Sequence, residues 1–217
     1  MIDKEVEIKS GSAVLPGMLV VPDGATGIVV FAHGSGSSRF SPRNQFVAGI
    51  LRRVGLGTLL IDLLEPQESE DRNKVFDIDL LAQRLVSATS FLRDEDETSR
   101  LAIGYFGAST GAAAALQAAA QLEDEVRAIV SRGGRPDLAA DYLPSVKAPT
   151  LLIVGGNDFP IIPLNREAFE ALTCPKELVI IPGATHLFEE PGALEEVARL
   201  AADWFVKYLM QSSPTKS

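Results

Sequence analysis

The sequence predicts an α/β protein, a three-layer α/β/α sandwich built around a mostly parallel sheet. Three observations predict it: short apolar runs, segments of helical spacing between them, and the regular alternation of the two. Strands of a parallel sheet read as nearly continuous apolar runs because helices cover both of their faces. Alternation of strand and helix is typical of such a sheet, since each parallel connection needs a crossover.

Six apolar runs predict the parallel strands. They occupy residues 27–32, 58–62, 101–106, 126–130, 150–154 and 178–181. Residues 5–8 and 15–21 read as two further strands with no helix between them, so an antiparallel pair is expected to precede the parallel series. Pro16 has no N–H to donate, and we expect the second of these strands to be interrupted or bulged near its start.

Five segments carry apolar residues at intervals of three and four, as amphipathic helices require. They are residues 42–54, 76–92, 109–122, 164–172 and 193–210. No repeat or linker separates the elements. The sequence therefore predicts one domain over residues 1–211, followed by a polar tail from Ser212 to Ser217.

Composition excludes several classes of function. A chain of 217 residues with 46% hydrophobic content can bury a core, and its net charge of −9 offers little to a nucleic acid. Cys174 is the only cysteine, so we expect no intrachain disulfide, no metal site and a cytoplasmic location. The N-terminal residues lack the apolar run of a secretory signal, and no stretch is apolar enough to suggest a membrane partner.

The segment with the clearest chemical meaning is Gly107-Ala108-Ser109-Thr110-Gly111, between an apolar run and an alanine-rich helix. A serine on a sharp strand-to-helix turn needs small neighbours, because the flanking elements pass close to it. The turn directs the hydroxyl over the carboxyl ends of the strands, beside the positive end of a helix. We therefore predict Ser109 as a nucleophile; an ordinary glycine-rich turn is the alternative.

A serine nucleophile needs a base, and the sequence has only two histidines. His186 follows the last apolar run, at the edge of the sheet where Ser109 is expected. Asp158 follows the run 150–154 and is predicted to orient His186 and stabilise its imidazolium. Asp137, at the start of an expected short helix, is the alternative acid; a turn-capping role is the alternative for Asp158.

The loop after residues 27–32 is predicted to complete the site. The backbone N–H groups of Ser35 and Thr110 are the expected donors of an oxyanion hole. Gly34 lets the backbone bend toward the nucleophile. His33 is expected to be a hydrogen-bonding brace rather than a second base.

Other side chains near these loops are candidates for substrate contact. Phe159, Leu187 and Phe188 are expected as apolar walls, with core packing as the alternative. Arg132 is the candidate for an anionic group, with Arg39 and Arg135 as further possibilities and simple solvation as the alternative. Only a short stretch separates residues 131 and 150, so we expect no large cap domain and an open, shallow cleft.

Four motifs together resemble those of the dienelactone hydrolase-like branch of the α/β-hydrolase superfamily, over essentially the whole chain. They are His33-Gly34-Ser35-Gly36, the turn around Ser109, Gly155-Gly156-Asn157-Asp158 and Gly183-Ala184-Thr185-His186. The resemblance implies an eight-stranded sheet with its second strand antiparallel, no cofactor, and ester hydrolysis through an acyl-enzyme. Dienelactone hydrolases carry a cysteine where this chain has Ser109, so dienelactone itself is not the expected substrate.

The sequence thus predicts a monomeric or homodimeric serine hydrolase that cleaves small to medium carboxylic esters or lactones. An acyltransferase or perhydrolase with the same triad is one alternative. A non-catalytic, ligand-binding member of the fold is the other.

Overall fold

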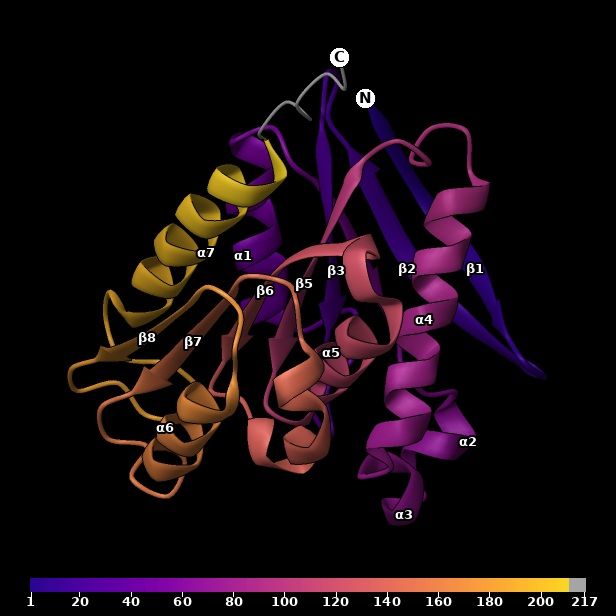
Figure 1. Ribbon diagram of the computed structural model, residues 1–217. Coiled ribbons are helices and arrows are strands. Elements are labelled where there is room, and N and C mark those ends of the chain that lie inside the picture. Colours follow the sequence, from indigo (N-terminus) through magenta and orange to yellow (C-terminus); the bar gives the residue numbers. More distant parts are fainter. Residues whose placement is uncertain (211–217) are drawn as a thin grey trace.

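The computed structural model describes residues 1–210, so the predicted tail from Ser212 to Ser217 lies outside the described residues. Within residues 1–210 the chain forms an eight-stranded sheet of order β1-β2-β4-β3-β5-β6-β7-β8 (Figure 1). The strands are β1 (Ile2–Ser10), β2 (Ala13–Val21), β3 (Gly27–Ala32), β4 (Gly57–Ile61), β5 (Ala102–Ala108), β6 (Val126–Arg132), β7 (Thr150–Gly155) and β8 (Lys176–Ile181).

The helices lie where the apolar spacing predicted them, the short helix expected at Asp137 follows β6, and further short helices follow β4 and directly precede β6. The α-helices are α1 (Pro42–Arg53), α2 (Pro66–Ser69), α3 (Arg72–Val75), α4 (Ile78–Asp94), α5 (Thr110–Leu122), α6 (Ile162–Ala171) and α7 (Ala193–Leu209). The 3₁₀ segments are η1 (Glu123–Glu125) and η2 (Pro136–Ser145). The sequence predicted neither α2 nor α3.

Strand directions confirm the mostly parallel sheet. β2 is antiparallel to both β1 and β4, and the other neighbouring strands are parallel. The bulge expected near Pro16 was wrong, because β1 and β2 pair without a register shift. The carbonyl of Pro16 accepts from Asp62 N–H (3.0 Å), so the missing proline donor faces β4 where that ladder ends, at Gly17 and Ile61.

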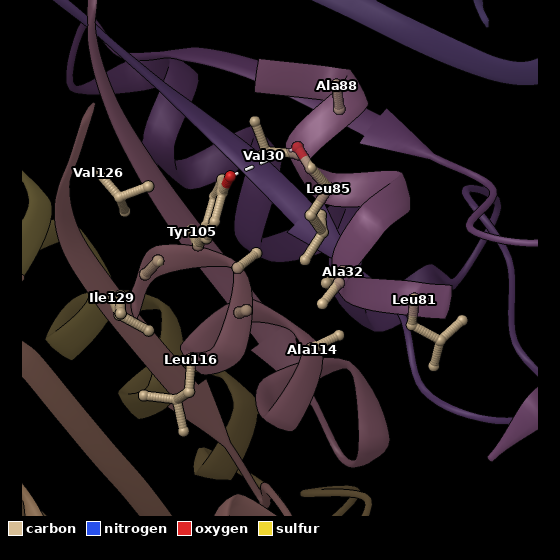
Figure 2. Packing of buried hydrophobic residues seen from close by; sticks show 14 of the residues in the cluster. Val30, Ala32, Leu81, Leu85, Ala88, Tyr105, Ala114, Leu116, Val126 and Ile129 are labelled. Atoms are coloured by element: carbon tan, nitrogen blue, oxygen red, sulfur yellow. Dashed lines mark hydrogen bonds between the residues drawn. The ribbon is translucent and has the colours of Figure 1, made fainter. Parts of the chain in front are cut away.

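Two hydrophobic cores hold the three layers together. One lies between the sheet and α4, α5, α6 and η2, and the other between the sheet and α1 and α7 (Figure 1). Tyr105 is fully buried in the first core, and its hydroxyl points toward the carbonyl of Leu85 on α4 at 3.4 Å (Figure 2). The same hydroxyl pairs with Thr89 Oγ1 at 2.5 Å, and burial raises the pKa of Tyr105. The buried hydroxyl of Tyr105 is therefore satisfied and neutral.

The parallel strands bring their following loops to one edge of the sheet, where sites of such folds lie. The short helices α2 and α3 lie at the end of the molecule opposite the N-terminus (Figure 1). None of the helices within residues 1–210 combines the length and the apolar composition needed to cross a membrane.

Candidate active site

Ser109 occupies a strained turn between β5 and α5. Its backbone angles are φ 51° and ψ −121°, a region that residues with a side chain rarely adopt. A Cβ atom on Gly107 would lie 2.5 Å from Ala112 Cα, and one on Gly111 would lie 2.2 Å from the carbonyl oxygen of Ala32. Only glycine fits at either position, which confirms the reason the sequence suggested for both.

The end of β6 holds this turn from both sides. Ser109 N–H donates to the carbonyl of Arg132 (3.3 Å), and Arg135 N–H donates to the carbonyl of Ser109 (3.1 Å). A strained backbone conformation persists when several contacts of the surrounding structure hold it in place, as these two hydrogen bonds do.

The predicted acid and base are in contact. His186 Nδ1 lies 2.6 Å from Asp158 Oδ2, and the carboxylate is buried while the imidazole is partly open to solvent. Since a carboxylate can only accept, Nδ1 carries the proton and Nε2 is left as the basic nitrogen. The alternative acid, Asp137, instead pairs with Arg135 at 2.7 Å, at the start of the short helix η2.

Ser109 and the His186–Asp158 pair both lie next to the peptide group that joins Arg132 and Gly133. Ser109 N–H bonds to the carbonyl of Arg132, and a Cβ atom on Gly133 would lie 3.4 Å from His186 Nδ1. Among the described residues, no hydrogen bond joins the Ser109 hydroxyl to His186. The structure thus brings the three predicted residues to one edge of the sheet and joins two of them directly.

The two predicted oxyanion donors also adjoin each other. Ser35 N–H donates to the Thr110 side-chain oxygen at 3.1 Å, while Thr110 N–H lies in the first turn of α5, where helix amides have no intrahelical partner. Gly34 lies against Ser109, because a Cβ atom on Gly34 would be 3.0 Å from Ser109 Cβ.

His33 is a brace, as predicted. Its Nδ1 donates to the carbonyl of Gly34 (2.9 Å), and its Nε2 accepts from Leu63 N–H (3.0 Å). Burial lowers the pKa of His33, so the neutral ring that these two bonds require is the stable form. The ring ties the loop after β3 to the loop after β4.

The candidate substrate contacts fall into two groups. Phe188 is 1% exposed and packs in the core with α1 and α7, so the packing alternative describes it. Arg132 is buried too, with Cζ 5.8 Å from the Phe188 ring centroid, and burial together with the nearby Arg43 charge lowers its pKa to about 10. Phe159 and Leu187, next in sequence to the acid and the base, are exposed at 70% and 40%.

A cavity of about 550 Å³ opens beside the oxyanion donors. Of the predicted site residues, its lining contains Gly34, Ser35 and Thr110 and none of Ser109, Asp158, His186, Arg132, Phe159, Leu187 and Phe188. The remaining lining residues come from the loops after β3 and β4, from α2 to α4, and from β2; they are Pro16, His33, Gly36, Ser37, Ser38, Arg39, Asp62, Leu64, Pro66, Ser69, Val75 and Leu81. Sequence reasoning missed Asp62 and the whole wall from α2 and α3.

One sequence signal for α2 was present. Glu65 and Glu68 form a reciprocal capping box around Pro66, which is the spacing of a helix start. Glu68 is buried against Arg84 (3.0 Å) on α4, and Lys74 of α3 approaches it at 3.2 Å. Burial alone would raise the pKa of Glu68, but the Glu65 amide and these two cations lower it. This ionic cluster anchors the outer wall of the cavity.

The fold and the arrangement of Ser109, Asp158 and His186 are typical of the α/β-hydrolase superfamily. The sequence pattern of the Dienelactone hydrolase family matches residues 15–211, and the chain belongs to that family. The structure is similar to the crystal structure of a dienelactone hydrolase from Anabaena variabilis ATCC 29413, with 59% identity and a TM-score of 0.93 over 96% of this chain and 98% of that one. It also resembles Est1E from Butyrivibrio proteoclasticus in fold, at 15% identity and a TM-score of 0.82, over 95% of this chain and 99% of that one.

Two curated relatives come from Mycobacterium tuberculosis strains and are provisionally named phosphoribosyl transferases. Each is 55% identical over 213 residues, which cover 98% of this chain and 48% of the relative. The chain therefore spans about half the length of the curated relatives it matches. Within residues 1–210, no group of three or more His, Cys, Asp or Glu side chains is placed to hold a metal ion.

Proposed function

We propose that the chain hydrolyses small to medium carboxylic esters or lactones through Ser109, His186 and Asp158 and an acyl-enzyme. The observation that carries the proposal is the 2.6 Å contact between buried Asp158 and His186, at the sheet edge that holds the strained Ser109. A strained serine and an oriented histidine are expensive to maintain and have a direct use together in acyl transfer.

The reaction begins at Nε2 of His186, the nitrogen that Asp158 leaves free. Nε2 takes the Ser109 proton as Oγ attacks the ester carbonyl, and the resulting imidazolium is stabilised by the Asp158 carboxylate. The alcohol then leaves with that proton as the ester C–O bond breaks, and water repeats the attack to release the acid. The Ser109–His186 hydrogen bond would form when substrate binds, since catalytic hydrogen bonds often tighten only in the enzyme–substrate complex.

The oxyanion would be held by Thr110 N–H and Ser35 N–H. The Ser35 amide donates to the Thr110 hydroxyl in the free enzyme, and the oxyanion would replace that hydroxyl as acceptor. The Thr110 hydroxyl must turn away first, and the Ser35 amide then points at the position where the negative charge develops. Loss of one such donor typically costs about 10²–10³ in rate.

Membership in a hydrolase family and the similarity to a named dienelactone hydrolase support this proposal. We further propose that the enzyme acts in the cytoplasm on a small-molecule ester, without a cofactor or metal, as a monomer or homodimer. Neither a nucleic acid nor a membrane is part of the proposed function.

Hydrolysis of p-nitrophenyl acetate tests the nucleophile. Ser109→Ala is expected to reduce kcat by about 10⁶, the usual cost of removing a triad nucleophile, and to leave only the residual rate that the remaining site supports. Cys174→Ala should leave it unchanged, since Cys174 is half-buried beside Thr150 and burial raises the pKa of its thiol. A fluorophosphonate probe should label Ser109 in the wild type; an unlabelled Ser109, or loss of activity in Cys174→Ala alone, would refute the assignment.

Two other reactions compete with hydrolysis. An acyltransferase or perhydrolase would use the same residues with an alcohol, amine or peroxide as acceptor, and product analysis with competing acceptors separates these from the hydrolase. Phosphoribosyl transfer is suggested by the name of the mycobacterial relatives, which are twice as long. We assign that activity to the half that this chain does not match; pyrophosphate release from phosphoribosyl pyrophosphate with a nucleobase acceptor would contradict this.

A further inference from the structure

The charged side chains that line the cavity beside the proposed oxyanion donors form an ion pair with each other. Of its lining side chains, only Arg39 and Asp62 carry a full charge at neutral pH, because the pKa of His33 is lowered by burial. Arg39 Nη1 contacts Asp62 Oδ2, and the backbone N–H of Arg39 donates to Asp62 Oδ1 at 2.6 Å. The two side chains face each other from the loops after β3 and β4.

This pair is largely withdrawn from water. The Arg39 and Asp62 side chains are 17% and 16% exposed, and the guanidinium stacks on the Phe40 ring with Cζ 4.1 Å from its centroid. Charges in such surroundings interact more strongly than exposed ones, and removing one partner leaves the other uncompensated. The wall therefore has no net charge only as long as both residues are present.

The rest of the lining suits an uncharged group. Pro16, Leu64, Val75 and Leu81 supply apolar surface, and Ser37, Ser38 and Ser69 supply hydroxyls that can donate or accept. A volume of about 550 Å³ is within the range of sites that enclose small organic ligands.

We propose that this cavity selects substrates with an uncharged substituent, and that Asp62 sets this selectivity by neutralising Arg39. The inference rests on the proposed ester hydrolysis and names the substrate class of that site. An anionic substituent would gain the attraction of Arg39 but meet the repulsion of Asp62 beside it, and would lose its hydration without compensation. The alternative is that Arg39 binds a carboxylate of the substrate directly, in which case the enzyme would prefer anionic substrates.

A charge series tests the proposal with a matched pair of esters, p-nitrophenyl butyrate and mono-p-nitrophenyl succinate. The quantity compared is the ratio of kcat/KM for the anionic ester to that for the neutral ester. We expect the wild type to favour the neutral ester, Asp62→Asn to raise the ratio about tenfold, and Arg39→Gln to lower it about tenfold. The double variant is again uncharged and should return close to the wild-type ratio.

Controls separate charge from other effects. Asp203→Asn removes the same charge from an exposed ion pair with Arg199 on α7 and should leave the ratio unchanged. The single variants are expected to shift the ratio in opposite directions, so a general loss of packing in one of them cannot imitate the result. A wild type that prefers the anionic ester, or a ratio that stays flat across the series, would overturn the proposal.

A binding measurement makes the result independent of turnover. In Ser109→Ala, calorimetry with dimethyl succinate and monomethyl succinate should give the same order of preference across the charge variants. If no variant with Ser109 hydrolyses any ester but this binding order holds, the proposed hydrolysis fails and the selectivity stands. If esters are hydrolysed and neither assay shows the order, the selectivity fails alone.

Discussion

The two halves of the candidate site are built in different ways. The half that carries Ser109, Asp158 and His186 is fixed by backbone contacts, such as the approach of Gly111 to the Ala32 carbonyl and the two hydrogen bonds that hold Ser109. The half that shapes the cavity is fixed by side chains: the Arg39–Asp62 pair, the bonds of His33, and the Glu68 cluster. We therefore expect the proposed chemistry to depend on the path of the main chain, and the proposed selectivity to depend on contacts between side chains.

The largest expected effect tests the backbone-built half. Asp158→Asn keeps the shape of the acid but removes its charge and disturbs the His186 tautomer, so kcat for p-nitrophenyl butyrate should fall about 10⁴-fold. Asp137→Asn removes the rival acid, which pairs with Arg135, and serves as the matched control with kcat close to wild type. Equal losses in the two variants would break the assignment of the acid.

A smaller effect concerns the close approach of main chains. Gly111→Ala places a methyl group 2.2 Å from a backbone oxygen that cannot move freely, so the free energy of unfolding should fall by about 3 kcal/mol or more. Gly49→Ala in α1 meets no atom within 4 Å and should instead be neutral or raise it by up to about 1 kcal/mol. Urea unfolding measures both, and a tolerated alanine at position 111 would contradict a half fixed by its main chain.

The smallest effect lies at the junction of the halves and depends on pH. The pKa of His33 is lowered in the folded state, so below about pH 6.5 the unfolded chain binds a proton that the folded chain resists. Stability should therefore fall as the pH falls, by up to about 1.4 kcal/mol per pH unit from this residue.

His33→Gln supplies the matched control, since its amide offers a donor and an acceptor but no titration in this range. Urea unfolding of both proteins between pH 8 and pH 5 should show a steeper loss in the wild type. Parallel curves would mean that His33 is not held in its neutral form by the bonds to Gly34 and Leu63.

The same contrast explains what the sequence could predict. The strands were predicted to within a few residues because their apolar runs are continuous. Ser109, Asp158 and His186 could be placed at one edge of the sheet because each follows such a run where loops converge. The direction of Arg132 was harder to foresee. Its side chain lies on the same face of β6 as Ala128 and Val130, which places it in the core rather than at the surface.

The residues of the cavity wall show no comparable pattern in the sequence. None of the residues of α3 is buried, and the one buried residue of α2 is Glu68, so apolar periodicity is absent from both helices. Asp62 is the last residue of the predicted strand 58–62, and its partner Arg39 lies 23 positions earlier in the sequence. No sequence periodicity relates two residues at that separation. Pairings between side chains of distant loops become visible only once the fold has brought those loops together.

The Glu68 anchor has a consequence for how this enzyme can diversify. The segment from Glu65 to Val75 rests on the body of the protein mainly through polar contacts, from Glu68 to Arg84 and from Glu65 to the Val14 amide, while Val75 packs against the edge of the first core. A different segment of similar length can replace it without loss of the sheet, provided that Arg84 keeps a carboxylate. We expect such an exchange to change the wall of the cavity without moving Ser109, Asp158 or His186.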